Sequence, residues 1–129
     1  MDNYFEINNF SNDDLDRFIN FSQDSSKIHS SYDYAISLGF EDRVCHGIMS
    51  LTPISRILGM ILPGEGYIIL EIKSKFHNPV YPNHSIEYNY KIISKNESLG
   101  IVCLEIKLLD KNGTMVSTTT AICKKVEPK

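Results

Sequence analysis

The sequence predicts an α+β fold in which a curved antiparallel sheet wraps around one central helix. The stretch from His46 to Gly64 is apolar on nearly every side, which is typical of a helix that is enclosed by protein. After Gly66, four long runs are rich in Ile, Val, Tyr and Thr and alternate with a period of two, which is typical of strands. Because an apolar sheet face and an apolar helix each need a cover, we expect them to pack against each other.

Length and charge indicate one globular domain. At 129 residues the chain has the usual size of a single domain, which we expect to span residues 1–129 and to bury a core without disulfides. The net charge of −3 provides no basic field that would select nucleic acid or an anionic membrane surface. We therefore predict no nucleic-acid partner, no membrane partner, no metal and no cofactor.

The cysteines and the N-terminus indicate a cytoplasmic protein. Cys45, Cys103 and Cys123 are odd in number and lack the paired spacing of a metal site, so we expect reduced thiols in a reducing cytosol. The acidic N-terminus lacks the basic start and the apolar run of a signal peptide. Polar residues interrupt the central stretch, so we expect no segment that spans a bilayer.

The first third of the chain should contain one edge segment and two short helices. Residues 4–10 alternate weakly and favour a strand or an edge segment. Residues 12–22 carry apolar side chains at helical spacing behind early acidic residues, which favours a helix. The serine-rich stretch 22–31 predicts a loop, because serine side chains compete for the local backbone. Residues 32–38 return to helical spacing, and Gly39 is placed to end this second helix in a left-handed conformation.

The central stretch should form one kinked helix. Pro53 has no N–H group, so it removes a helical hydrogen bond, kinks the helix and frees a carbonyl toward a pocket. Arg56 lies on this apolar helix, where we expect it to reach solvent or to pair at a subunit interface. His46 stands at the helix start, where we expect a structural role.

The four runs after Gly66 should form an antiparallel sheet. They cover residues 67–76, 85–93, 99–110 and 114–126. The turn segments between them are all short enough to join antiparallel neighbours, and the last two have the composition of hairpins. The alternation predicts an inward face with Ile72, Ile86, Tyr88, Val102, Leu104 and Ile106, and an outward face with Lys73, Lys75, Glu87 and Glu105.

Few residues stand out as candidates for chemistry: Asp24 and His29 in the polar loop, His46 and Gly47 at the start of the central helix, and Ser55 two turns further along. Asp24 and His29 share one polar loop, where both can act on one water, one removing a proton and the other supplying or orienting it. Gly47 opens the central helix, where its N–H group has no intrahelical acceptor and could receive a developing oxyanion. A thiol mechanism through Cys45 and His46 is disfavoured, because adjacent side chains in an extended segment point to opposite sides.

Two segments that contain these residues resemble a known family. SQDSSKIH (residues 22–29) followed by HGIMSLTPISRILGMILPGEG (residues 46–66) resembles the signatures of the MaoC-like (R)-specific enoyl-CoA hydratases. That family has S-G-D-x-N-P-[IL]-H, then a His-Gly step opening the central helix, a serine within it, and L-P-G-x-G after it. FHNPVYPNHSI (residues 76–86) is similar to the family's F-x-x-P-V-x-x-G-D-x-[VI]. The resemblance extends from about Leu15 to Ala121 and implies the hot-dog fold.

The resemblance implies an activity and roles for individual residues. The activity is the addition or removal of water at the double bond of a trans-2-enoyl thioester, with an (R)-3-hydroxyacyl product. The thioester is carried by coenzyme A or by acyl carrier protein, and the enzyme is a homodimer. Asp24 and His29 match the acid–base pair, Gly47 matches the amide that binds the thioester carbonyl, and Ser55 matches the helix serine that supports the catalytic group. Ser26 and His46 match supporting positions.

The loop departs from the family pattern at three positions. Ser26 and Lys27 stand where the family usually has Asn and Pro, and Ser31 stands where Asp is common. Because serine is shorter and the loss of proline frees the backbone, a looser loop is expected. Lys27 is expected to point to solvent.

Two other functions are compatible with the same sequence. A thioesterase on this fold would direct a carboxylate and a water to the carbonyl carbon, and the presence of His29 argues against it. A non-catalytic module that binds acyl thioesters remains an alternative, because Ser26 and Lys27 depart from the family pattern.

The sequence does not discriminate between coenzyme A and acyl carrier protein as the carrier of the thioester. The basic residues that could contact either a phosphate or an acidic carrier protein are Lys73, Lys75, Lys91 and Arg43.

Overall fold

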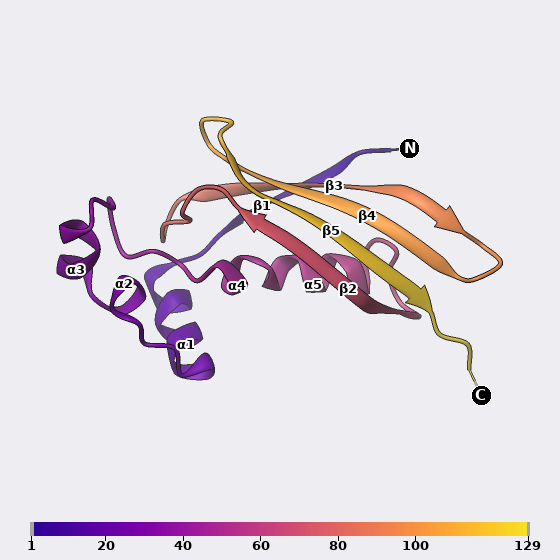
Figure 1. Ribbon diagram of the computed structural model, residues 1–129, viewed down its shortest axis with the longest axis horizontal. Helices are drawn as coiled ribbons and strands as arrows, with labels where there is room; N and C mark the ends of the chain where they lie inside the picture. The colour runs from indigo at the N-terminus through magenta and orange to yellow at the C-terminus, as the bar shows by residue number, and fades with distance from the viewer. Residues whose placement is uncertain (1, 129) are drawn as a thin grey trace.

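The computed structural model describes residues 2–128 and confirms the α+β fold, with one five-stranded antiparallel sheet in the order β1-β3-β4-β5-β2. The elements are β1 (Tyr4–Asn9), α1 (Asn12–Ser22), α2 (Lys27–Ser30), α3 (Tyr32–Ser37), α4 (Gly47–Ser50), α5 (Thr52–Met60), β2 (Tyr67–Phe76), β3 (Ser85–Asn96), β4 (Ile101–Asp110) and β5 (Met115–Lys125). In Figure 1, α4 and α5 run along one face of the sheet, and α1, α2 and α3 lie together beyond one end of it.

The strand pairing confirms both predicted hairpins and corrects a third connection. β4 pairs with β3 and with β5, and Gly113 in the second hairpin has the positive φ of 79° that its turn requires. β2 was expected beside β3, but it pairs with β5, because β1 occupies the other edge of β3. The connecting segment 77–84 can extend by about 3.3 Å per residue, which is enough to cross three strand spacings of about 4.8 Å.

The inward face of the sheet carries the core, as predicted. Side chains of β3 and β4 are buried with at most 5% exposure at Ile86, Tyr88, Val102, Leu104 and Ile106, and Ile72 packs against them from β2. Ile54, Ile57 and Leu58 of α5 complete the same cluster. Burial of apolar area at this helix–sheet interface is therefore the main stabilising term of the fold.

The central helix breaks where the proline predicts, but the freed carbonyl is capped. α4 and α5 are separated at Leu51, and Pro53 lies in the first turn of α5, where the lack of an N–H group costs least. The carbonyl oxygen of Met49 accepts a 2.8 Å hydrogen bond from the Thr52 hydroxyl. The expectation of a free carbonyl directed at a pocket was therefore wrong.

The sheet covers only one side of the central helix. The prediction that protein encloses the helix on all sides was wrong, because Ile48 is 70% exposed and Met60 is 67% exposed. A single layer of five strands buries only the helix face that is turned toward it. On the other side, Arg56 pairs with Glu6 of β1 within the same chain, so this arginine is bound by neither of the two arrangements expected for it.

The helices before the central stretch follow their local signals. Ser11 caps α1: its hydroxyl accepts from the Asp14 N–H at 3.0 Å, and the Asp14 carboxylate accepts from the Ser11 N–H at 2.9 Å. Gly39 follows α3 with φ of 92°, as predicted. The stretch 22–31 was expected to be loop throughout, but it contains the single helical turn α2, because the Ser26 carbonyl accepts from the N–H groups of His29 and Ser30.

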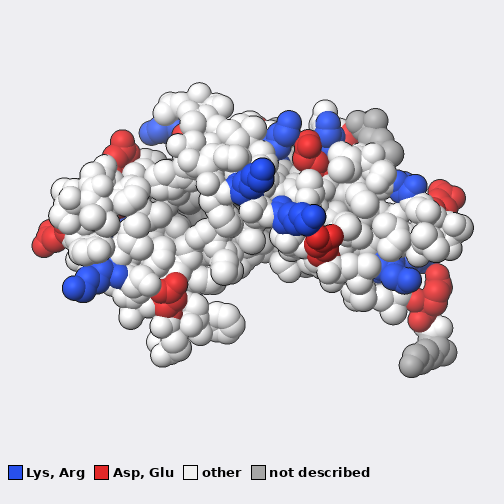
Figure 2. Space-filling view, viewed as in Figure 1, with Lys and Arg blue, Asp and Glu red and all other residues white. Residues whose placement is uncertain are grey.

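The surface carries both signs of charge. In Figure 2, basic side chains over the strands lie among acidic ones, and further charges of both signs surround the ends of the molecule. Among residues 2–128, every helix is too short or too polar to cross a membrane.

Candidate active site

Asp24 is restrained by its own loop. Ser26 donates twice to Asp24 Oδ1, from its hydroxyl at 2.5 Å and from its N–H at 3.1 Å, and the Asp24 N–H donates to Ser22 Oγ at 3.1 Å. The Ser26 hydroxyl, followed by the Ser26 N–H, lowers the pKa of the Asp24 carboxyl, because both groups bind the ionised form. Ser26, which was expected to loosen the loop, therefore orients a carboxylate that is ionised at neutral pH.

His29 is oriented through one ring nitrogen. Its Nδ1 lies 2.5 Å from the carbonyl oxygen of Val44, and a carbonyl can only accept, so Nδ1 carries the hydrogen. Nε2 then has the free lone pair. The Val44 N–H donates to the Ile28 carbonyl at 3.0 Å, so Val44 binds the loop through both of its backbone groups.

His46 lies beneath both candidate catalytic groups. The side chain is 5% exposed, and its Nε2 lies 2.9 Å from the main-chain carbonyl oxygen of Asp24 and 3.8 Å from Asp24 Oδ2. Its ring stacks on that of His29 with centroids 3.7 Å apart and an interplanar angle of 18°. Phe18 of α1 contacts the same ring edge-on at 4.8 Å.

Asp24, His29 and His46 thus form one cluster. One side-chain atom from each, a carboxylate oxygen or a ring nitrogen, lies within 4.8 Å of the other two. A water that makes hydrogen bonds of about 2.8 Å can bridge a carboxylate and a ring nitrogen at such a separation. Donors of this kind also bind divalent metals, but Nδ1 of His29 and Nε2 of His46 are already bonded to carbonyl oxygens.

Gly47 begins α4 directly after His46, where a larger residue would contact the ring of Phe76 closely. A Cβ atom at this position would lie 3.1 Å from the ring of Phe76, at the end of β2. The Gly47 N–H belongs to the first turn, where no intrahelical acceptor exists. The Phe76 ring, which is half-exposed, therefore packs against the helix start, and a side chain at Gly47 would have to displace this ring by a few tenths of an ångström.

Ser55 is the predicted site residue that the structure does not join to the cluster by a hydrogen bond. It is exposed on α5, and a rise of about 1.5 Å per residue places it about 12 Å along the helix from Gly47. Its N–H donates to Leu51, and its hydroxyl makes no hydrogen bond with residues 2–128. The supporting role of Ser55 remains a prediction. The Ser50 hydroxyl, by contrast, donates to the Gly47 carbonyl at 2.5 Å.

Three contributors to the site were not identified from the sequence. They are the Val44 carbonyl, the Phe76 ring and the Ser50 hydroxyl. Every residue has a carbonyl, so nothing in the composition marks the one at Val44 as a hydrogen-bond acceptor. Ser50 stands three residues after Gly47, a spacing that allows its hydroxyl to reach back to the first turn, and this signal was available.

Two neighbouring residues take no direct part in the cluster. Lys27 is exposed, and its Nζ lies 5.8 Å from the centroid of the Tyr34 ring. Cys45 is buried, and its burial raises the pKa of the thiol to about 12. A thiolate nucleophile is therefore disfavoured at this position.

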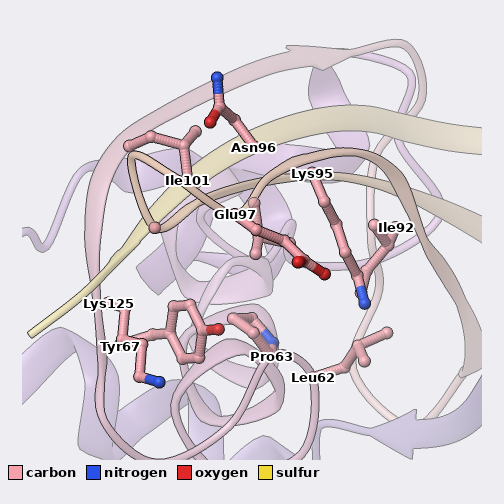
Figure 3. Close-up of a pocket in the computed structure, with 11 residues that line it drawn as sticks. Leu62, Pro63, Tyr67, Ile92, Lys95, Asn96, Glu97, Ile101 and Lys125 are labelled. Carbon is pink, nitrogen blue, oxygen red and sulfur yellow. The ribbon is translucent and has the colours of Figure 1, made fainter.

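A cavity of about 400 Å³ lies apart from the cluster. Its lining comes from the segment after α5, from the start of β2, from the turn between β3 and β4, and from the end of β5. Figure 3 shows Glu97 and Lys95 reaching into it above Leu62 and Pro63. No residue of the cluster lines this cavity.

Comparison with known proteins identifies similar hydratases. The chain is 26% identical to the (R)-specific enoyl-CoA hydratase of Aeromonas caviae over 107 residues, which are 83% of this chain and 80% of that protein. It is 39% identical to the (R)-specific enoyl-CoA hydratase of Rhodospirillum rubrum over 70 residues, which are 54% of this chain and 49% of that protein. No protein-family profile matches the sequence.

A solved structure shows the same fold. The chain superposes on an (R)-hydratase from A. caviae with a TM-score of 0.90 and 23% identity, over 97% of this chain and 95% of that one. The hot-dog fold that the sequence resemblance implied is thereby confirmed. The fold and the sequence matches together also confirm the family resemblance.

Proposed function

We propose that this chain, which resembles the MaoC-like hot-dog hydratases and dehydratases in sequence and fold, interconverts trans-2-enoyl and (R)-3-hydroxyacyl thioesters by adding or removing water. The observation that carries this proposal is the placement of the Asp24 carboxylate and a His29 ring nitrogen within 4.8 Å. A single water fits between two such groups. Residues 1–129 are proposed to form one catalytic domain.

In the proposed hydration, Asp24 and His29 share the attacking water. The ionised carboxylate of Asp24 takes one proton from the water, while Nε2 of His29 accepts a hydrogen bond from the second O–H group, which stays on the oxygen, and so orients the water. The water oxygen forms a bond to the β-carbon, and the electron pair of the double bond moves toward the thioester oxygen. The α-carbon then takes the proton back from Asp24 on the same face, which gives syn addition. Dehydration follows the reverse order.

Gly47 is proposed to stabilise the charge that develops on the thioester oxygen. Its N–H at the start of α4 is free of an intrahelical acceptor, and a fixed donor aimed at a developing oxyanion lowers the barrier. The polar cluster and Gly47 are adjacent, since His46 belongs to the cluster and directly precedes Gly47. Ser55 keeps the supporting role that the resemblance implies.

A homodimer is proposed from the resemblance and from the edge of the sheet. β2 is an edge strand, and its exposed apolar side chains include Ile68, Leu70 and Phe76. An edge strand with apolar side chains is a ready site for pairing. Sedimentation at several protein concentrations would test this assembly. The free thiols of Cys45, Cys103 and Cys123 support the proposed cytoplasmic location.

The proposed activity is tested with purified protein and crotonyl-CoA. Loss of the enoyl absorbance without release of thiol would support the hydratase, whereas release of thiol would indicate a thioesterase. If neither signal appears with any chain length, on coenzyme A or on acyl carrier protein, the chain is an acyl-thioester binding module. Comparison of rates on the two carriers identifies the preferred one, and coupling to dehydrogenases specific for the (R)- or (S)-alcohol identifies the product.

A further inference from the structure

We propose that His46 is a positioning residue that fixes both members of the acid–base pair: its Nε2–H binds the main chain of Asp24, and its ring face supports the ring of His29. This inference rests on the proposed function, since it concerns how that pair is arranged. It goes beyond a structural role at the helix start, because it predicts which nitrogen of His46 carries the hydrogen and which kinetic constant depends on it.

The burial of His46 is the first observation. The side chain is 5% exposed, and its Nδ1 is buried without any hydrogen-bond partner among residues 2–128. A buried polar atom without a partner is unfavourable, and an apolar ring of similar size would fill the same space without that cost. The presence of histidine is explained by what its other nitrogen and its ring face contact.

The second observation is how little else restrains Asp24. Its carboxylate side chain is 48% exposed, and its other hydrogen bonds are to Ser22 and Ser26 of the same short segment. Within the described residues, the bond to His46 Nε2 at 2.9 Å is the hydrogen bond that joins Asp24 to the rest of the protein. Without it, Asp24 could move relative to His29, which Val44 holds separately.

The third observation is the tautomer that these contacts demand. The Asp24 carbonyl only accepts, so Nε2 of His46 carries the hydrogen and Nδ1 has the lone pair. His29 has the opposite tautomer, because its Nδ1–H donates to the Val44 carbonyl and its Nε2 has the lone pair. The two stacked rings, with centroids 3.7 Å apart, therefore present different tautomers, and the lone pair that can receive a hydrogen from water is on Nε2 of His29.

Three substitutions separate the two contacts of His46. His46→Gln retains an N–H donor near the position of Nε2 and loses the ring, His46→Phe retains the ring face and loses the donor, and His46→Ala loses both. Because misplacement of a catalytic group by about 1 Å can cost about 100-fold in rate, we expect kcat to fall about 100-fold for His46→Ala and less for the other two. KM should change less than kcat, because the His46 side chain contacts Asp24, His29 and Phe18, whereas the thioester carbonyl is proposed to bind the main-chain N–H of Gly47. His84→Ala, at a histidine in the turn before β3, is the matched control.

Two measurements on the protein without substrate test the arrangement directly. Two-bond ¹⁵N–¹H spectra should report an Nε2–H tautomer for His46 and an Nδ1–H tautomer for His29. Amide exchange at Ser26 should accelerate in His46→Phe, because the donor to Asp24 is gone, and less in His46→Gln. An Nδ1–H tautomer at His46 would overturn the inference, as would unchanged exchange and unchanged kcat in folded His46→Phe and His46→Gln.

The inference and the proposed function can fail separately. If the wild-type protein hydrates no enoyl thioester, the proposed function fails, while the tautomers and the exchange rates still decide whether His46 holds the loop. If hydration is observed and neither His46→Phe nor His46→Gln lowers kcat more than His84→Ala does, the proposed function stands and the inference is wrong. If His46→Ala does not fold, the Gln and Phe variants and the wild-type spectra decide.

Discussion

Different interactions restrain the loop that carries Asp24 and His29 and the central helix α5. The short helix α2 in the loop contains no buried residue, whereas four residues of α5 are buried, among them Ile54 and Ile57 at 0% exposure. Hydrogen bonds to backbone groups restrain the loop, and apolar packing restrains the helix. Changes in the loop should therefore affect catalysis more than stability, and changes in α5 should do the reverse.

The largest effect is expected from removing the acid–base groups. Asp24→Asn and His29→Ala should each lower the kcat for hydration of crotonyl-CoA by about 10²- to 10⁴-fold, because general acid–base catalysis contributes about that much. The melting temperature should stay nearly unchanged, since neither side chain belongs to the apolar core. Enoyl absorbance and thermal unfolding measure the two quantities. Asp33→Asn, an exposed aspartate of α3, is the control, and near-wild-type turnover in Asp24→Asn or His29→Ala would remove that residue from the mechanism.

The opposite pattern is expected for the helix. Ile57→Ala should lower the free energy of unfolding by about 2–5 kcal/mol, because it leaves a cavity between α5 and the sheet. The kcat of the protein that remains folded should change little. Urea unfolding monitored by circular dichroism gives the stability, and Met60→Ala, at an exposed position of the same helix, should stay within about 0.5 kcal/mol of wild type. A large fall in kcat without loss of stability would contradict the separation of the two regions.

Gly47 lies where the two regions meet, so its replacement should affect both properties. Gly47→Ala introduces a Cβ atom 3.1 Å from the Phe76 ring, and overpacking of this kind costs about 1–3 kcal/mol. Activity should fall as well, because the helix start shifts relative to the thioester. In Gly47→Ala with Phe76→Leu, the smaller side chain should restore much of the stability. Gly59→Ala is the control, since its Cβ would meet no atom within 4 Å; equal effects of the two glycine substitutions would exclude the contact with Phe76 as the cause.

The smallest effect is expected from Ser26, which acts on the exposed carboxylate of Asp24. The hydrogen bond from the Ser26 hydroxyl makes the largest contribution to the lowered pKa of Asp24, and the bond from the Ser26 N–H makes the next largest. A group whose pKa is lowered by folding stabilises the fold above its unfolded pKa, and this contribution is lost as the pH falls through the folded pKa. Ser26→Ala removes one donor, so the pKa of Asp24 should rise and the acidic limb of the kcat/KM profile should move to higher pH. A ¹³C carboxyl titration gives the pKa, and movement of the limb to lower pH would contradict this account.

Local patterns in the sequence predicted most of the elements. Helical spacing identified α1 and α3, period-two alternation identified β2 to β5, and Pro53 marked the break between α4 and α5. These features depend on neighbours a few residues apart, which a sequence displays directly. The strand partner of β2 was missed because pairing is decided by which edges remain free after all strands are placed.

The sequence by itself determined the fold class, the inward face of the sheet and the two segments that resemble the hydratase family. Each of these features depends on residue types and on their spacing along the chain. The tertiary structure alone decided that Val44 orients His29, that His46 lies beneath both Asp24 and His29, and that Phe76 packs against Gly47. These contacts join residues that are 15, 22 and more positions apart, through backbone carbonyls and ring faces. Every chain contains such groups throughout its length, so only their positions in space distinguish the ones that form the site.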